Sequence, residues 1–224
     1  MIGTGKSTQV QANATIKVMP VKVDPTRIRE FKSFEAFYKW LSKHHDKDYE
    51  VWIKVHKLGS GLPSINPKDA IDAALCWGWI DGLRKAFDDK SFLQRYTRRG
   101  KKSIWSQINV QNVSRLINQG KMTEHGFKQV NAAKADGRWH RAYQSGRKMK
   151  LPDDLLAAID AEPRARNMLQ ELNAQNRYAL AFRIHNMKTE AGRKKKIETF
   201  VAMLKRGETI HPQGKKQGKQ QAKK

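Results

Sequence analysis

The sequence has a single cysteine, no long apolar run and few acidic residues. Cys76 stands alone among 224 residues, so no intramolecular disulfide can form and secretion gains no support. The chain has no run of about 18 apolar residues, which excludes a transmembrane helix. Its first residues, MIGTGKSTQVQANATIKV, lack the continuous apolar core of a signal peptide. These absences predict a cytoplasmic protein.

Signatures of catalysis and of metal binding are also missing. The histidines show neither H-E-x-x-H nor paired-cysteine spacing, so no metal site is predicted. The GSG at 59–61 is not the G-x-S-x-G nucleophile elbow. GTGKST at 3–8 resembles the end of a Walker A loop, but the first glycine of that motif would have to precede Met1. We therefore predict a non-enzymatic protein with no catalytic residue, metal or cofactor.

What the chain has in excess is positive charge. It carries 45 basic against 21 acidic residues, a formal net charge of +24. Residues 1–26 contribute +2 and residues 212–224 contribute +5, so residues 27–211 keep +17. A basic folded region favours polyanionic partners, above all nucleic acid, although a basic surface can also serve solubility alone.

The first half of the chain alternates helical and strand patterns. Ser33 is placed to cap a helix whose apolar residues recur at i, i+3, i+4 and i+7. Residues 49–57 alternate between apolar and polar side chains, which predicts a half-buried strand. Asn66-Pro67 is a typical helix start, with a capping side chain followed by proline.

The segment LCWGWIDGLRKAF, residues 75–87, predicts a junction between a helix and a hairpin. Gly78 stands where a residue in the left-handed conformation would end the preceding helix. Residues 79–84 and 91–98 both have strand patterns, and residues 88–90 supply the turn between them.

The remaining chain is predicted to be helical. Two short helices end at Gly120 and Gly137, residues 144–150 form a linker, and further helices follow up to Gly207. One of these has the apolar stripe Tyr178, Phe182 and His185. The fold class is thus α+β: a small antiparallel sheet with packed helices, then a small all-helical domain. The predicted segments are a flexible extension (1–26), an α+β domain (27–143), a helical domain (151–211) and a disordered basic tail (212–224).

Residues 91–115 contain six basic residues and no acidic one. The cations are Arg95, Arg98, Arg99, Lys101, Lys102 and Arg115, and two aromatic residues, Tyr96 and Trp105, lie among them. Arginine binds phosphate in a bidentate manner, and exposed aromatic rings stack on bases. The segment therefore predicts a nucleic-acid surface. The alternative is that both aromatic residues belong to the core and the cations form a solvated rim.

Asp81 is the one acidic residue of its strand, within cross-strand reach of residues 95–98. We interpret it as a structural ion-pair partner, for which a depressed pKa is expected. Two alternatives stay open. Asp81 and neighbouring arginines, Arg95 in particular, could converge in a cleft that binds a small ligand or catalyses a reaction, or the C-terminal helices could serve as a protein-interaction adaptor.

Five blocks of the sequence carry a family resemblance. They are ALCWGWIDG, FLQRYTRR, KSIWSQINVQNVSRLINQGKM, AAKADGRW and RIHNMKTEAGRKKKIETFVAMLKRGETIHP. Over about residues 30–212 the chain resembles the YdeI/OmpD-associated, or bacteriocin-protection, family. The resemblance implies a YjbR/CyaY-like first domain, a helical OmpD-associated second domain and a link to tolerance of bacteriocins or cationic antimicrobial peptides. YjbR-like relatives have been suggested to bind DNA.

The resemblance and the basic segment together define the candidate binding residues. They are Trp79, Asp81, Gly82, Arg95, Thr97, Arg98, Arg99, Lys101, Lys102, Ser103, Trp105, Ser106 and Asn109. Arg98 departs from the family pattern, in which a proline is expected at this place. We thus predict a cytoplasmic stress-tolerance protein that binds an anionic partner, nucleic acid or another polyanion.

Overall fold

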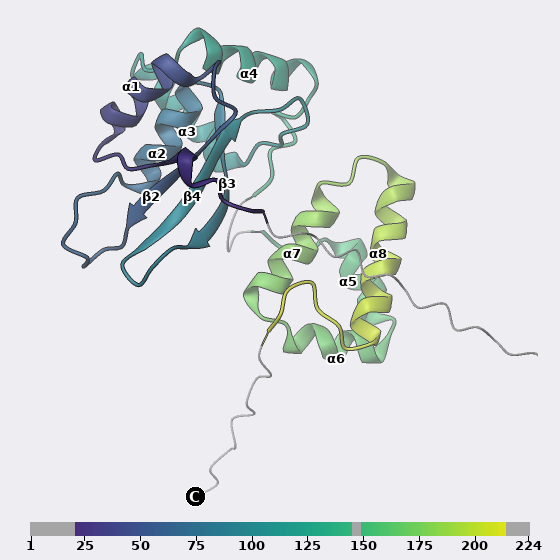
Figure 1. Ribbon diagram of the computed structural model, residues 1–224. Helices are drawn as coiled ribbons and strands as arrows, with labels where there is room; N and C mark the ends of the chain where they lie inside the picture. The colour runs from purple at the N-terminus through teal and green to yellow at the C-terminus, as the bar shows by residue number, and fades with distance from the viewer. Residues whose placement is uncertain (1–20, 145–148, 214–224) are drawn as a thin grey trace, which may run out of the picture.

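The computed structural model describes residues 21–144 and 149–213, which form two lobes (Figure 1). The first lobe, residues 25–143, combines a sheet with packed helices, and the second lobe, residues 151–213, is helical. The predicted α+β class with a following helical region is confirmed. Most of the predicted extension, linker and tail (residues 1–20, 145–148 and 214–224) lies outside the described residues.

The sheet of the first lobe has the strand order β1-β2-β4-β3. The predicted hairpin is confirmed: β3 (Trp79–Ala86) and β4 (Ser91–Arg98) pair antiparallel, and β2 (Glu50–His56) pairs antiparallel with the other side of β4. A two-residue strand, β1 (Ile28–Arg29), adds to β2 in parallel. It follows a 3-10 turn at Pro25–Arg27, and neither was predicted because such short elements leave no periodic pattern.

Four helices of the first lobe begin at capping side chains. They are α1 (Phe34–His44), α2 (Pro67–Cys76), α3 (Gln107–Asn118) and α4 (Glu124–Ala135). Ser33 and Asn66 accept hydrogen bonds from backbone amides of the first turns of α1 and α2, as predicted. Ser106 and Thr123 cap α3 and α4 in the same way. Each helix start is therefore fixed by its local sequence.

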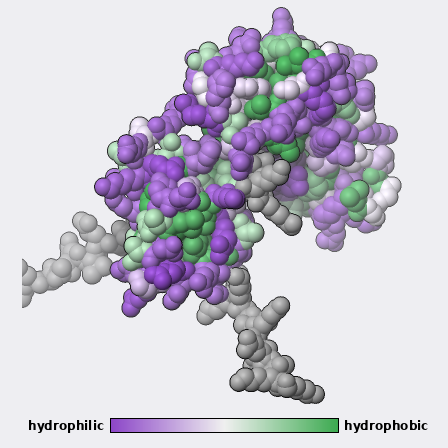
Figure 2. Space-filling model, turned by 180° about the vertical axis from the view of Figure 1, so that it is seen from behind, coloured by the Kyte–Doolittle hydropathy of each residue, from purple (hydrophilic) through white to green (hydrophobic). Residues whose placement is uncertain are grey.

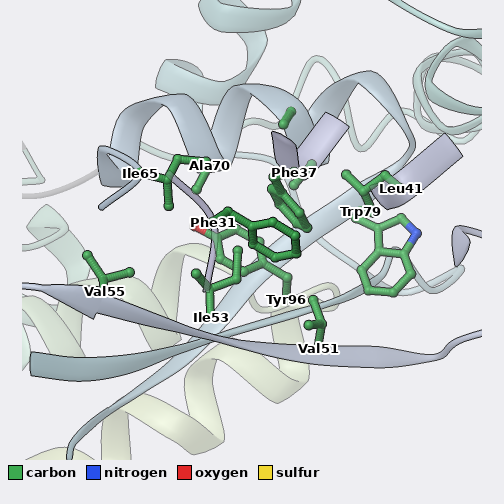
Figure 3. Close-up of a cluster of buried hydrophobic side chains, with 12 residues drawn as sticks. Phe31, Phe37, Leu41, Val51, Ile53, Val55, Ile65, Ala70, Trp79 and Tyr96 are labelled. Carbon is green, nitrogen blue, oxygen red and sulfur yellow. The ribbon is translucent and has the colours of Figure 1, made fainter. Parts of the chain in front are cut away.

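The main core lies between the sheet and helices α1 and α2 (Figure 3). Phe37 and Leu41 of α1 meet Val51 and Ile53 of β2, and all four are fully buried. The opposite face of β2 is not simply exposed, as a half-buried strand predicts, because Trp52 is also fully buried there. A second cluster around Trp105 lies between the end of α2 and helices α3 and α4.

Glycines end the helices where the sequence predicted. Gly78, Gly120, Gly137 and Gly207 all have positive φ values, between 64° and 77°. Gly78 also permits close packing, since a Cβ there would lie 2.8 Å from the His125 carbonyl oxygen. The helix-to-strand junction at 76–79 is therefore held against the first turn of α4.

The second lobe consists of four helices around a separate core. They are α5 (Asp153–Asp160), α6 (Pro163–Glu171), α7 (Ala174–His185) and α8 (Glu190–Lys205). Its buried residues, among them Leu155, Leu180 and Phe200, share no member with the clusters of the first lobe. Within the described ranges, no helix is both long and apolar enough to span a bilayer.

The helix predicted around Tyr178, Phe182 and His185 is confirmed as α7, but this stripe is not the face that the helix buries. The helix buries Asn176, Leu180 and Ile184, whereas Tyr178 and Phe182 are half-buried and His185 is exposed. Phe182 packs edge-on against Tyr143 of the first lobe, with ring centroids 4.9 Å apart. The aromatic face of α7 therefore meets the first lobe and does not fill the helical core.

Cys76 lies at the end of α2 and is fully buried. Its backbone carbonyl oxygen accepts hydrogen bonds from both the amide and the hydroxyl of Thr123, at 3.2 and 2.6 Å. Burial raises the pKa of the Cys76 thiol to about 12. The thiol is thus a packing group that stays protonated at neutral pH.

Candidate anion-binding cleft

Asp81 and Arg95 lie on opposite faces of the sheet. Asp81 pairs with Tyr96, whose side chain belongs to the helix-covered core. Arg95 directly precedes Tyr96 in β4 and pairs with Trp52 on the other face. Because successive residues of a strand point to opposite faces, the two side chains do not converge. The alternative of a cleft built from Asp81 and Arg95 is therefore not realised.

Asp81 makes no ion pair with any described residue within 4 Å. Burial raises the pKa of its carboxyl, and the attraction of Arg99 and Arg84 only partly offsets that effect. The expected depressed pKa is therefore wrong. The sequence placed arginines nearby, but it gave no measure of how strongly the carboxylate is desolvated.

Several arginines of the basic segment have structural partners. Arg95 forms an ion pair with the buried Glu50, and Arg115 forms one with the buried Asp72, each at 2.6 Å. Arg98 is exposed, and its Nε donates to the backbone oxygen of Asp48 at 2.8 Å. These contacts stabilise the first lobe and leave fewer cations for a ligand than the sequence suggests.

Arg99 is buried, with only 5% of its surface exposed. Its guanidinium carbon lies 3.6 Å from the centre of the Trp105 ring, and its Nη1 donates to the Ile104 carbonyl oxygen. Burial lowers the pKa of Arg99 to about 10, so it remains charged at neutral pH. Tyr96 and Trp105 are buried as well, so they are core residues and cannot stack on bases.

The remaining polar candidates shape the backbone around the hairpin. Ser106 Oγ accepts the Asn109 amide at 3.2 Å, and Ser103 Oγ accepts the Gly100 amide at 3.0 Å. The Trp79 indole donates to the His45 carbonyl oxygen at 3.3 Å. The backbone oxygen of Gly82 accepts from Gln94, and Thr97, half-buried, pairs with Ile80 and Glu50 in the sheet.

Lys101 and Lys102 remain exposed, and Lys102 lines a cleft of about 290 Å³. The other lining residues are Ile104, Arg138, Arg141, His185, Asn186, Met187 and Lys188. The first three of these and Lys102 belong to the first lobe, and residues 185–188 form the end of α7 and the segment after it in the second. We call this hollow the interlobe cleft. Among the described residues, its lining contains four permanently charged cations and a histidine but no carboxylate.

Two arginines of the interlobe cleft are held in place by the first lobe. The Arg138 Nε donates to Asp136 at 2.7 Å and its Nη1 to the Ser103 carbonyl oxygen at 2.8 Å. The Arg141 Nη2 donates to the Asp136 carbonyl oxygen at 3.2 Å. Each guanidinium keeps further N–H groups for a ligand. Guanidinium groups that are held in place suit phosphate or carboxylate groups, and Arg141, which forms no ion pair with a described residue, keeps its full charge for such a ligand.

Sequence reasoning missed most of the interlobe cleft. Of its cations it singled out only Lys102, while His185 was assigned to the apolar stripe of a helix. Arg138 and Arg141 follow the C′ glycine of α4, Gly137, and that clustering of cations after a helix end was the available signal.

Seen from behind, both lobes are covered mainly by hydrophilic residues, with apolar side chains gathered in smaller areas (Figure 2).

The fold and the cleft together define a two-lobed α+β protein with a cation-lined hollow between its lobes. Residues 148–207 match the family model described as "Bacteriocin-protection, YdeI or OmpD-Associated". Residues 29–129 match a model described as a domain of unknown function, DUF8412. No curated protein and no solved structure matches the chain. The resemblance is thus supported for the helical lobe, and the YjbR/CyaY-like character of the first lobe stays a prediction.

Proposed function

We propose that this protein binds nucleic acid through the interlobe cleft, in the cytoplasm, as part of a bacteriocin-protection function. The observation that carries the proposal is the set of described residues that line the cleft, which includes Lys102, Arg138, Arg141 and Lys188 and no carboxylate. Of these cations only Arg138 forms an ion pair with a described residue, Asp136. The net charge of +24 extends the same preference to the whole chain. Such a field attracts polyanions and raises their association rate.

The family description supports the physiological part of the proposal. The model that matches residues 148–207 names bacteriocin protection, and this segment contributes His185 and Lys188 to the cleft. We therefore expect protection and nucleic-acid binding to depend on the same residues. A strain that lacks the protein should regain bacteriocin tolerance from the wild-type gene but not from a gene with altered cleft cations.

The salt dependence of binding tests whether the interlobe cleft binds nucleic acid. Each phosphate contact contributes roughly 0.7 to 0.9 log units of affinity per log unit of salt. Replacing Lys102, Arg141 and Lys188 by Gln should lower the slope measured by fluorescence anisotropy with a labelled oligonucleotide. The control replaces Lys219, Lys223 and Lys224, which lie outside the described residues, and removes the same number of charges.

Two results would reject the proposal. One is an equal loss of slope in the cleft variant and in the tail control, which would assign the affinity to charge in general. The other is binding to vesicles of anionic lipid without binding to the oligonucleotide, which would identify a membrane surface as the partner.

A further inference from the structure

We infer that the interlobe cleft accepts one unpaired nucleotide, so that the protein prefers single-stranded nucleic acid to duplex. The inference rests on the proposed function and adds the form of the nucleic acid that the cleft can take. It depends on the size of the cleft, on the depth at which Arg138 lies and on the apolar side chains that line the cleft.

The size of the cleft suits a single nucleotide. Its volume of about 290 Å³ lies just below the range of roughly 300 to 1,000 Å³ found for small-molecule sites. Proteins that read duplex DNA instead insert a protruding helix or ribbon into a groove about 12 Å wide. Here Lys102, Arg141 and Lys188 are exposed beside a hollow and Arg138 is recessed in it, so a nucleic acid that contacts all four has to place a group inside the hollow.

The depth of Arg138 points the same way. Only 12% of its side chain is exposed, and its hydrogen bonds to Asp136 and Ser103 keep it in the cleft wall. A phosphate on the outside of a stacked duplex cannot reach so recessed a group without entering the hollow. An extruded nucleotide of a single strand can, because it carries no paired strand beside it.

Apolar side chains from both lobes complete the site. Ile104 of the first lobe and Met187 of the second are half-buried and line the cleft. They offer apolar contact to an unstacked base, whose faces are available only when it leaves a duplex. Asn186, next to Met187, also lines the cleft and can hydrogen-bond a base edge.

A nucleotide in this position would contact both lobes. Arg141 belongs to the first lobe, whereas Lys188 belongs to the second, and like charges on facing walls repel. A phosphate between them offsets that repulsion. Binding should therefore draw the lobes together around the ring contact between Tyr143 and Phe182.

Fluorescence anisotropy of the full-length protein with two labelled probes tests the inference. One probe is a 12-nucleotide oligothymidylate, and the other is its duplex with oligoadenylate; the dissociation constants of the two are compared. We expect about tenfold tighter binding of the single strand, which corresponds to one base contact. The double variant Arg141→Gln/Lys188→Gln should remove most of this preference. The control Lys39→Gln/Lys128→Gln removes the same charge from exposed positions on α1 and α4 and should keep the preference.

The possible results separate this inference from the proposed function. Equal affinity for the two forms, or an equal effect of the two double variants, would overturn the single-strand site while nucleic-acid binding stands. Binding of neither form would reject the proposed function itself. Both substituted pairs are exposed, and matching thermal unfolding curves would confirm that the variants are folded.

Discussion

Arg95 and Glu50 form an ion pair in which both Nη2 and Nε of the arginine contact one carboxylate oxygen, Oε2, at 2.6 and 2.7 Å. The Glu50 side chain is only 8% exposed, whereas that of Arg95 is 30% exposed. The arginine therefore compensates a carboxylate that the sheet has removed from water. This use explains why a basic residue of the hairpin is not available to a ligand.

Loss of Arg95 should destabilise the first lobe. Arg95→Met keeps an apolar stem but leaves the buried Glu50 carboxylate unpaired, at a cost of about 2 to 4 kcal/mol in the free energy of unfolding. Urea unfolding measures this. The double variant Glu50→Gln/Arg95→Met should recover part of the loss, because it removes the unpaired charge. A loss below about 1 kcal/mol in Arg95→Met would contradict the structural role.

Asp81 should make stability depend on pH in the direction opposite to that of a salt-bridged aspartate. Because burial raises its pKa in the folded state, the folded protein binds the proton more tightly than the unfolded chain does. Its stabilising contribution is fully present below the ordinary value of 3.8 and is lost as pH rises through the folded pKa. Asp81→Asn should therefore be more stable than the wild type at pH 7.

Unfolding curves of the wild type and of Asp81→Asn, measured over a series of pH values, check the direction of this pH dependence. The advantage of Asp81→Asn should shrink as the pH falls and should vanish below about 3.8. A variant that is less stable than the wild type at pH 7, with a deficit that grows with pH, would restore the ion-pair interpretation.

Gly126 should not tolerate a side chain. It lies in the first turn of α4 against the end of α2, and an added Cβ would be 3.0 Å from the Cys76 carbonyl carbon and 2.8 Å from the Met122 Cε. Gly126→Ala should cost about 2 to 3 kcal/mol, since backbone has to move to relieve the overlap. Gly82→Ala is the matched control, because the nearest atom there is 3.8 Å away. Equal stability of the two variants would show that the helices can separate without cost.

Limited proteolysis tests the predicted domain division. The segment QSGRKMK, residues 144–150, is basic, contains glycine and lacks periodicity, so we expect early tryptic cuts there and in the terminal tails. Because the cores of the lobes share no residue, two stable fragments should remain. Mass spectrometry of the fragments locates the cuts. Early cuts within residues 27–140 would place the domain boundary elsewhere.

The features that could be predicted from the sequence are those that depend on neighbouring residues. Ser33 and Asn66 start helices, Gly78 ends one, and the hairpin after it follows from two strand patterns and a turn. In the first two cases a side chain accepts a hydrogen bond from a backbone amide a few positions away, and in the third a glycine adopts the left-handed conformation that ends the helix. Contacts with residues distant in the sequence did not override these local effects.

The candidate site could not be predicted in the same way. An arginine beside an aromatic residue suits both a ligand surface and a core, and only tertiary packing placed Arg99 on Trp105 inside the first lobe. The interlobe cleft joins Lys102, Arg138 and Lys188, which come from three distant parts of the chain. No local sequence pattern predicts that these residues lie close together. The one available indication was that the apolar stripe of α7 ends in a polar residue, His185.

The burial of Cys76 makes the chain suited to site-specific spectroscopy. With a pKa of about 12 and no exposed surface, its thiol should react slowly with maleimide or iodoacetamide reagents while the protein is folded. Cysteines introduced at exposed positions on α1 and α8, for example at Lys39 and Lys195, would thus be the sites modified by a donor and an acceptor dye. Energy transfer between them would report directly how far the lobes move when a nucleotide enters the cleft.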